Sequence, residues 1–115
     1  RLSHMETVLN RFLLEYPNLP QSDGGRAFFE MKAQGVLLSY ITTVMLVETD
    51  RKKGRRLGEA MMNQFRDRLP GTYDRSVMQY KIFRCMNLLG LKKATWERIL
   101  HSKLYRKVRH SHDFN

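Results

Sequence analysis

The sequence predicts an all-α fold, a small bundle of four to five helices joined by short loops. Apolar residues recur at three- and four-residue steps along most of the chain. The three prolines and seven glycines lie mostly between these periodic stretches. The composition, 42% hydrophobic and 28% charged, is that of a folded globular protein. With 115 residues there is room for one domain, which we expect at residues 1–109, followed by a frayed tail at 110–115.

The first two helices are predicted from their apolar patterns. Apolar residues of the segment 2–16 fall on one helical face, and prolines and glycines predict a loop at 17–25. The next helix, 26–48, is apolar on most sides, as expected for the centre of a bundle. Its β-branched residues also allow a strand at 36–47, but the length of the run favours a helix. The uncharged stretch 33–47 is shorter than the roughly 20 residues that cross a bilayer.

A third helix is predicted to begin within the basic cluster 51–56, behind a cap from Thr49 or Asp50, and to end at Pro70-Gly71. Basic residues in a first turn oppose the helix macrodipole, at a few tenths of a kcal/mol each. Either the helix begins nearer Arg56 and leaves a basic loop, or the cluster binds a partner.

A fourth helix is predicted to be capped by Thr72 or Asp74 and to end at Gly90, a residue suited to a left-handed C-terminal position. Cys85 lies on its apolar stripe with no histidine at a predictable distance, so we expect a buried structural thiol. The full stripe is Val77, Met78, Ile82, Cys85, Met86 and Leu89.

A fifth helix is predicted from about residue 92 or 95 to residue 108. Trp96 and Tyr105 lie on its apolar face, and basic residues border that face. This pattern is typical of helices that lie in a membrane interface, with Trp96 as the anchor. The alternative is that the apolar face packs on the bundle and the charges face solvent.

Positive charge is concentrated in the second half of the chain. Residues 1–50 hold four basic side chains against six acids, a net of −2, and residues 51–115 hold seventeen against five, a net of +12. A folded basic face favours a polyanion, either nucleic acid or an anionic membrane surface. The predicted anion- or membrane-binding residues are Arg51, Lys52, Lys53, Arg55, Arg56, Lys93, Trp96, Arg98, Lys103, Arg106 and Lys107.

No catalytic, metal or cofactor site is predicted. The carboxylates are few and scattered, with no pair placed for acid–base chemistry. His101, His110, His112 and Asp113 lack a recognised ligand spacing. The single cysteine forms no internal disulfide, and no secretory signal is visible, so a cytoplasmic location is expected.

The second half resembles the C-terminal helical region of bacterial family 2 glycosyltransferases of the GT-A type, which build surface polysaccharide. The resemblance lies in the stretches 81–93, from Lys-Ile-Phe-Arg to Leu-Gly-Leu-Lys-Lys, and 99–107, from Ile-Leu-His to Leu-Tyr-Arg-Lys. Residues 2–10 are similar to the helix that follows the catalytic domain. The family's aspartate-x-aspartate metal motif and catalytic base have no counterpart in this chain.

The resemblance implies an accessory region of a glycosyltransferase, with nucleotide sugar and divalent metal bound only by an upstream domain. The chain opens at Arg1 rather than methionine, so we expect a C-terminal fragment of a longer protein. Such a region would dock on its catalytic domain and rest on the inner face of the cell membrane. Two alternatives stay open: a small basic nucleic-acid-binding module, and a non-catalytic bundle that binds an acidic protein.

Overall fold

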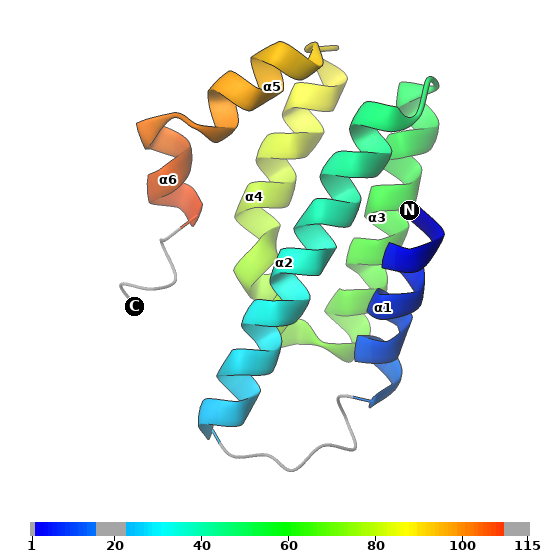
Figure 1. Ribbon diagram of the computed structural model, residues 1–115, viewed down its shortest axis with the longest axis vertical. Helices are drawn as coiled ribbons and strands as arrows, with labels where there is room; N and C mark the ends of the chain where they lie inside the picture. The colour runs from blue at the N-terminus through cyan, green and yellow to red at the C-terminus, as the bar shows by residue number, and fades with distance from the viewer. Residues whose placement is uncertain (1, 16–22, 110–115) are drawn as a thin grey trace.

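The computed structural model describes residues 2–15 and 23–109 (Figure 1), and this part of the chain is helical and contains no strand. The predicted all-α class is confirmed, and residues 2–15 and 23–109 form six helices in place of the four or five expected. The helices are α1 (Leu2–Glu15), α2 (Asp23–Val47), α3 (Arg51–Arg68), α4 (Pro70–Leu88), α5 (Lys93–Leu100) and α6 (Lys103–Arg109). The predicted tail at 110–115 and most of the predicted loop at 17–25 lie outside the described residues.

Helices α2, α3 and α4 form the centre of the bundle, running up, down and up in Figure 1. Helix α1 flanks α2 on one side, and α5 and α6 form an arm that lies over α4 on the other. Helix α2 contacts α1, α3 and α4, which explains why its sequence is apolar on most sides. The buried apolar core draws on all six helices: Leu9, Leu13, Ala33, Leu37, Tyr40, Ile41, Val44, Met45, Met61, Met62, Phe65, Leu69, Phe83, Met86, Trp96 and Tyr105.

Helix α3 begins at Arg51, so the basic cluster is helical and does not form a loop. Asp50 is the N-cap: its Oδ1 accepts hydrogen bonds from the backbone N–H groups of Lys52 at 3.0 Å and Lys53 at 3.3 Å. The cap satisfies two of the donors that a helix start leaves open, and its negative charge partly offsets the basic first turn.

Helix α4 begins at Pro70, so the predicted caps Thr72 and Asp74 are wrong. Proline suits the first position of a helix because its fixed φ is helical and it has no N–H to satisfy. The predicted end is confirmed: Gly90 has a φ of 69°. Its N–H donates to the Asn87 carbonyl at 3.0 Å, and the Leu91 N–H donates to the Met86 carbonyl at 3.2 Å.

The buried face of α4 differs from the predicted apolar stripe, because much of it is polar. Its buried residues are Thr72, Ser76, Gln79, Phe83, Met86 and Asn87. Of the predicted stripe, Met78 and Leu89 are exposed, and so is Cys85, which we expected to be buried. Hydrogen bonds explain the difference, since every buried side-chain nitrogen or oxygen of the described residues has a partner.

The predicted fifth helix is two helices, interrupted at His101-Ser102. The Ser102 hydroxyl donates to the Ile99 carbonyl at 2.7 Å and accepts from the Tyr105 N–H at 3.2 Å. Ser102 thus closes α5 and caps α6. The predicted single amphipathic face does not exist, because α5 and α6 run in different directions (Figure 1).

Two glycines of α3 face α2, but only one lies where a side chain does not fit. A Cβ at Gly54 would lie 2.6 Å from the Val44 carbonyl oxygen, whereas a Cβ at Gly58 would meet Met45 and Ile41 side chains at 3.5 Å or more. Gly54 therefore sets the close approach of α2 and α3.

Gly54→Ala is expected to destabilise the bundle by about 1–2 kcal/mol, because overpacking costs ~1–3 kcal/mol and alanine returns up to ~1 kcal/mol of helix propensity. Gly58→Ala, the matched control, is expected to stabilise by up to about 1 kcal/mol. Urea unfolding followed by circular dichroism measures both. Equal effects of the two substitutions would contradict the assigned contact.

Helix α1 is fixed to α2 by an aromatic and a polar contact. The rings of Phe12 and Phe29 meet edge to face, with centroids 5.8 Å apart and planes at 82°. The Tyr40 hydroxyl donates to the Glu6 carboxylate at 3.3 Å. Burial, together with the Glu6 charge and hydrogen bond, raises the pKa of Tyr40 from 10.0 to about 12.

This raised pKa predicts alkaline unfolding that depends on Tyr40. Because the folded pKa lies above the unfolded value, the stabilisation is complete below pH 10 and is lost as pH rises toward about 12. In Tyr40→Phe, the free energy of unfolding should fall less over this interval than in the wild type. Identical slopes in the two proteins, measured by urea unfolding at each pH, would rule out the linkage.

Candidate functional site

The structure divides the predicted binding residues between two places. Arg51, Lys52, Lys53, Arg55 and Arg56 open α3 at the end of the bundle where α2 and α4 finish and α5 begins (Figure 1). We call this the basic end. Lys93, at the start of α5, belongs to it, and so does Lys92, which the sequence analysis did not select. The other group lies along the arm: Arg98 on α5, and Lys103, Arg106 and Lys107 on α6.

Side-chain contacts between the start of α3 and the end of α4 hold the cations in place at the basic end. The Arg51 guanidinium packs directly against Gly90. The Asn87 side chain donates to the Arg51 carbonyl at 3.4 Å and accepts from Arg55 Nη1 at 2.8 Å. One buried asparagine on α4 therefore fixes the basic first turns of α3 beside the start of α5.

Few of the cations at the basic end are neutralised. Lys53 pairs with Glu48 at 3.8 Å, and the Asp50 carboxylate caps the backbone of α3. Within the described ranges, the side chains of Lys52, Arg56, Lys92 and Lys93 make no ion pair or hydrogen bond, and all four are exposed. The basic end therefore presents positive charge to solvent.

Exposed apolar side chains accompany the cations. Val47 ends α2 and is 65% exposed, and Leu88 and Leu89 end α4 and are 56% and 74% exposed. On the arm, Leu104 is 75% exposed between basic neighbours on α6. Sequence analysis did not select any of these four residues as part of a binding surface. The one available signal was the Leu88-Leu89 pair directly before Gly90, because the last turn of a helix at a bundle end is poorly covered.

Trp96 was predicted to be an interfacial anchor, and this prediction is wrong: it is 1% exposed and belongs to the core. Its ring lies on Phe83 with centroids 5.8 Å apart, and Tyr105 stacks on the same Phe83 at 6.1 Å. The Tyr105 hydroxyl also accepts a hydrogen bond of 2.7 Å from Gln79. These contacts bind the arm to α4, as the alternative interpretation of the fifth helix expected for its apolar face.

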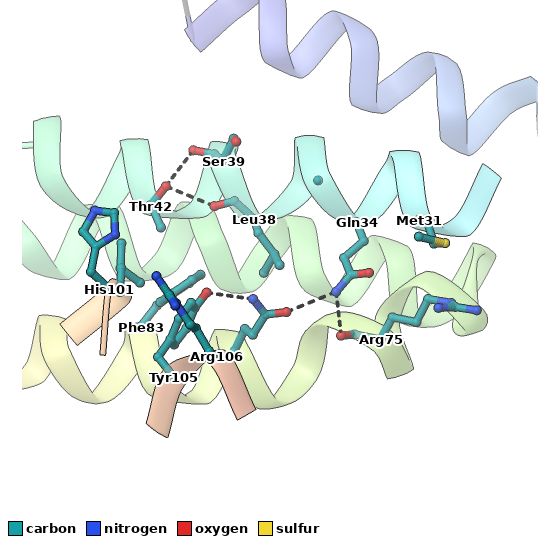
Figure 2. Close-up of a pocket in the computed structure, with 13 residues that line it drawn as sticks. Met31, Gln34, Leu38, Ser39, Thr42, Arg75, Phe83, His101, Tyr105 and Arg106 are labelled. Atoms are coloured by element: carbon teal, nitrogen blue, oxygen red, sulfur yellow. Dashed lines mark hydrogen bonds between the residues drawn. The ribbon is translucent and has the colours of Figure 1, made fainter. Parts of the chain in front are cut away.

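A row of polar side chains runs from the arm across α4 to α2 (Figure 2). Gln79 donates to Tyr105, and Gln34 Nε2 donates to Gln79 Oε1 at 3.1 Å and to the Arg75 carbonyl at 3.0 Å. Both amide groups are thereby oriented. Sequence analysis did not select this row, although residues 76, 79, 83 and 87 share a helical face.

A metal ion would need a cluster of histidine, cysteine or carboxylate side chains to bind it. No group of three or more histidine, cysteine or carboxylate side chains lies close enough to hold a metal ion in these ranges. Burial, followed by the charge of Glu59, raises the pKa of Tyr80. Among the described residues, no helix is both long enough and apolar enough to cross a bilayer.

Comparison with models of protein families, with curated proteins and with solved structures gives no match for this chain. The resemblance to glycosyltransferase C-terminal regions therefore stays a prediction from the sequence.

The hydrogen bond between Tyr105 and Gln79 gives a test of how the arm is held. Tyr105→Phe keeps the ring on Phe83 but leaves a buried Gln79 N–H without its acceptor, so a loss of about 1–3 kcal/mol in unfolding free energy is expected. Tyr73→Phe is the control, because Tyr73 is partly buried and makes no hydroxyl hydrogen bond among the described residues. Similar losses in both variants would contradict the role of this bond.

Proposed function

We propose that this chain is an accessory helical region of a glycosyltransferase, which holds its enzyme on the anionic inner face of the cell membrane through the basic end. The support is one observation: exposed cations and exposed apolar side chains lie at the same end of the bundle. The glycosyl-transfer part rests on the sequence resemblance, and the upstream domain is its proposed intramolecular partner.

An anionic membrane matches both components of this surface. Each lysine or arginine near an anionic leaflet contributes roughly 1 kcal/mol, and the effect decays within a Debye length. Leu88 and Leu89 add apolar area that can enter the headgroup boundary, at up to ~1.5–3 kcal/mol for each side chain fully buried. Since Trp96 is in the core, the leucines replace it as the proposed anchors.

The alternative of nucleic-acid binding uses the same cations but not the leucines. Phosphodiester contacts by Lys52, Arg56 and Lys93 would give affinity that falls steeply with salt. An acidic protein partner would also engage these cations. Replacing the exposed leucines should therefore weaken binding to a membrane but not binding to nucleic acid, and this difference distinguishes the two hypotheses.

Flotation with vesicles tests the membrane proposal. The wild type is expected to bind vesicles containing phosphatidylserine and not vesicles of phosphatidylcholine alone. Leu88→Gln/Leu89→Gln should weaken binding at least tenfold, because two apolar anchors are removed. Leu14→Gln is the matched control, since Leu14 is 64% exposed but lies on α1 near the opposite end.

A charge pair completes this test. Lys52→Glu/Lys93→Glu should abolish binding to anionic vesicles, whereas Arg68→Glu, at the far end of α3, should leave it nearly unchanged. Failure of the wild type to bind anionic vesicles, or equal binding to neutral ones, would refute the membrane role. Unchanged binding of a DNA duplex by the leucine variant, without vesicle binding by the wild type, would favour the nucleic-acid alternative.

The glycosyltransferase part has a separate test. The coding sequence upstream of Arg1 is expected to encode a nucleotide-sugar domain with an aspartate-x-aspartate motif. A reading frame without such a domain would remove this part of the proposal and leave the membrane part standing.

A further inference from the structure

A groove of about 560 Å³ lies between α2, α4 and the arm, away from the basic end (Figure 2). Leu38 and Ser39 of α2, Arg75 and Gln79 of α4, and His101 and Arg106 of the arm are among the residues that line it. Its volume is in the range of small-molecule sites, roughly 300–1,000 Å³. The groove exists because the arm is folded back on Phe83, so that its residues form one wall.

The side chains lining this groove that can carry a charge near neutral pH are all nitrogen bases. Of the 13 described residues that line it, Arg75 and Arg106 carry guanidinium groups and His101 an imidazole, and none of the 13 is acidic. The side chains of these three residues make no hydrogen bond or ion pair with other described residues. Their donors are therefore available to a ligand.

Figure 2 shows how these donors are distributed. His101 and Arg106 lie near one end, beside Tyr105, while Arg75 extends toward Met31 at the other end. Between the ends, Leu38 supplies apolar surface, and Met31, 54% exposed, extends this surface at the Arg75 end. The polar row of Gln34, Gln79 and Tyr105 is occupied by its internal hydrogen bonds. This arrangement fits a ligand that has an anionic group at one end and an apolar chain, its stem, beyond it.

We propose that the groove binds a single-chain phosphate amphiphile, with the phosphate at His101 and Arg106 and the apolar stem over Leu38 toward Met31. A phosphate group offers several acceptor oxygens to the planar guanidinium of Arg106 and to an imidazole N–H. The stem is excluded from water by the apolar surface between the ends. This site is independent of the membrane surface proposed for the basic end.

Gly35 provides a way to test the groove without disturbing the fold. It lines the groove on the exposed face of α2, and a Cβ built there meets no atom within 4 Å. Gly35→Glu introduces a carboxylate into the site, and Gly35→Gln introduces nearly the same shape without charge. Both residues favour a helix more than glycine does, so both variants are expected to fold.

Binding is measured by titration calorimetry with n-octyl phosphate below its micellar concentration and without vesicles. The wild type should bind octyl phosphate at least tenfold more tightly than inorganic phosphate or n-octyl glucoside. Gly35→Glu should weaken this binding at least tenfold by charge repulsion, and Gly35→Gln by no more than about threefold. Leu88→Gln/Leu89→Gln should bind it as the wild type does.

Three results would overturn the proposal: no binding of octyl phosphate to the wild type, equal binding of octyl glucoside, or equal affinities of the Gly35→Glu and Gly35→Gln variants. Vesicle flotation reports on the basic end alone. If the protein binds octyl phosphate but not vesicles, the proposed membrane function is refuted and the groove site is retained. If it binds vesicles but not octyl phosphate, the groove site is refuted and the membrane function is retained.

Discussion

Phe83 of α4 holds the arm, because Trp96 from α5 and Tyr105 from α6 both pack against its ring. Two aromatic side chains from helices of different direction reach one ring only if the chain bends between them, and the Ser102 cap supplies this bend. The bend removes the predicted continuous amphipathic helix. It also creates one wall of the groove and separates Lys103, Arg106 and Lys107 from the basic end.

The polar face of α4 also contributes to holding the bundle together. Gln79 and Asn87 are each 3% exposed, and an unpaired amide at that depth would cost about 1–3 kcal/mol. Gln79 is satisfied by Gln34 and Tyr105, and Asn87 by α3. Because hydrogen bonds are directional, they specify the relative positions of the helices more closely than apolar packing alone would. The same Asn87 contacts fix the cationic first turns of α3 beside the exposed leucines.

Local rules predicted much of the fold. The N-cap at Asp50, the left-handed Gly90 and the apolar face of α1 follow from residue types within a few positions of each other. The burial of polar residues on α4 did not follow, because it depends on hydrogen-bond partners from α2, α3 and α6. The start of α4 was mispredicted although proline at the first helical position is a local signal. Periodicity indicates which residues share a face, but it does not identify the partner of that face.

The same distinction applies to the candidate site. Sequence analysis selected the cations of the basic end, since charge density is visible in one dimension. It misplaced Trp96, because an aromatic residue beside lysines looks alike in a core and in a membrane interface. The groove was not predicted at all, since its walls come from residues 31–42, 75–83 and 100–106. Only the docked arm brings these segments together.

Trp96 is the single tryptophan of the chain, so its fluorescence reports on the arm directly. We expect blue-shifted emission that is weakly quenched by acrylamide, and no added quenching by brominated lipid when anionic vesicles bind, because Trp96 stays on Phe83. Emission as accessible to acrylamide as that of a free indole, or strong quenching by brominated lipid, would show that the arm leaves the bundle and would contradict this account.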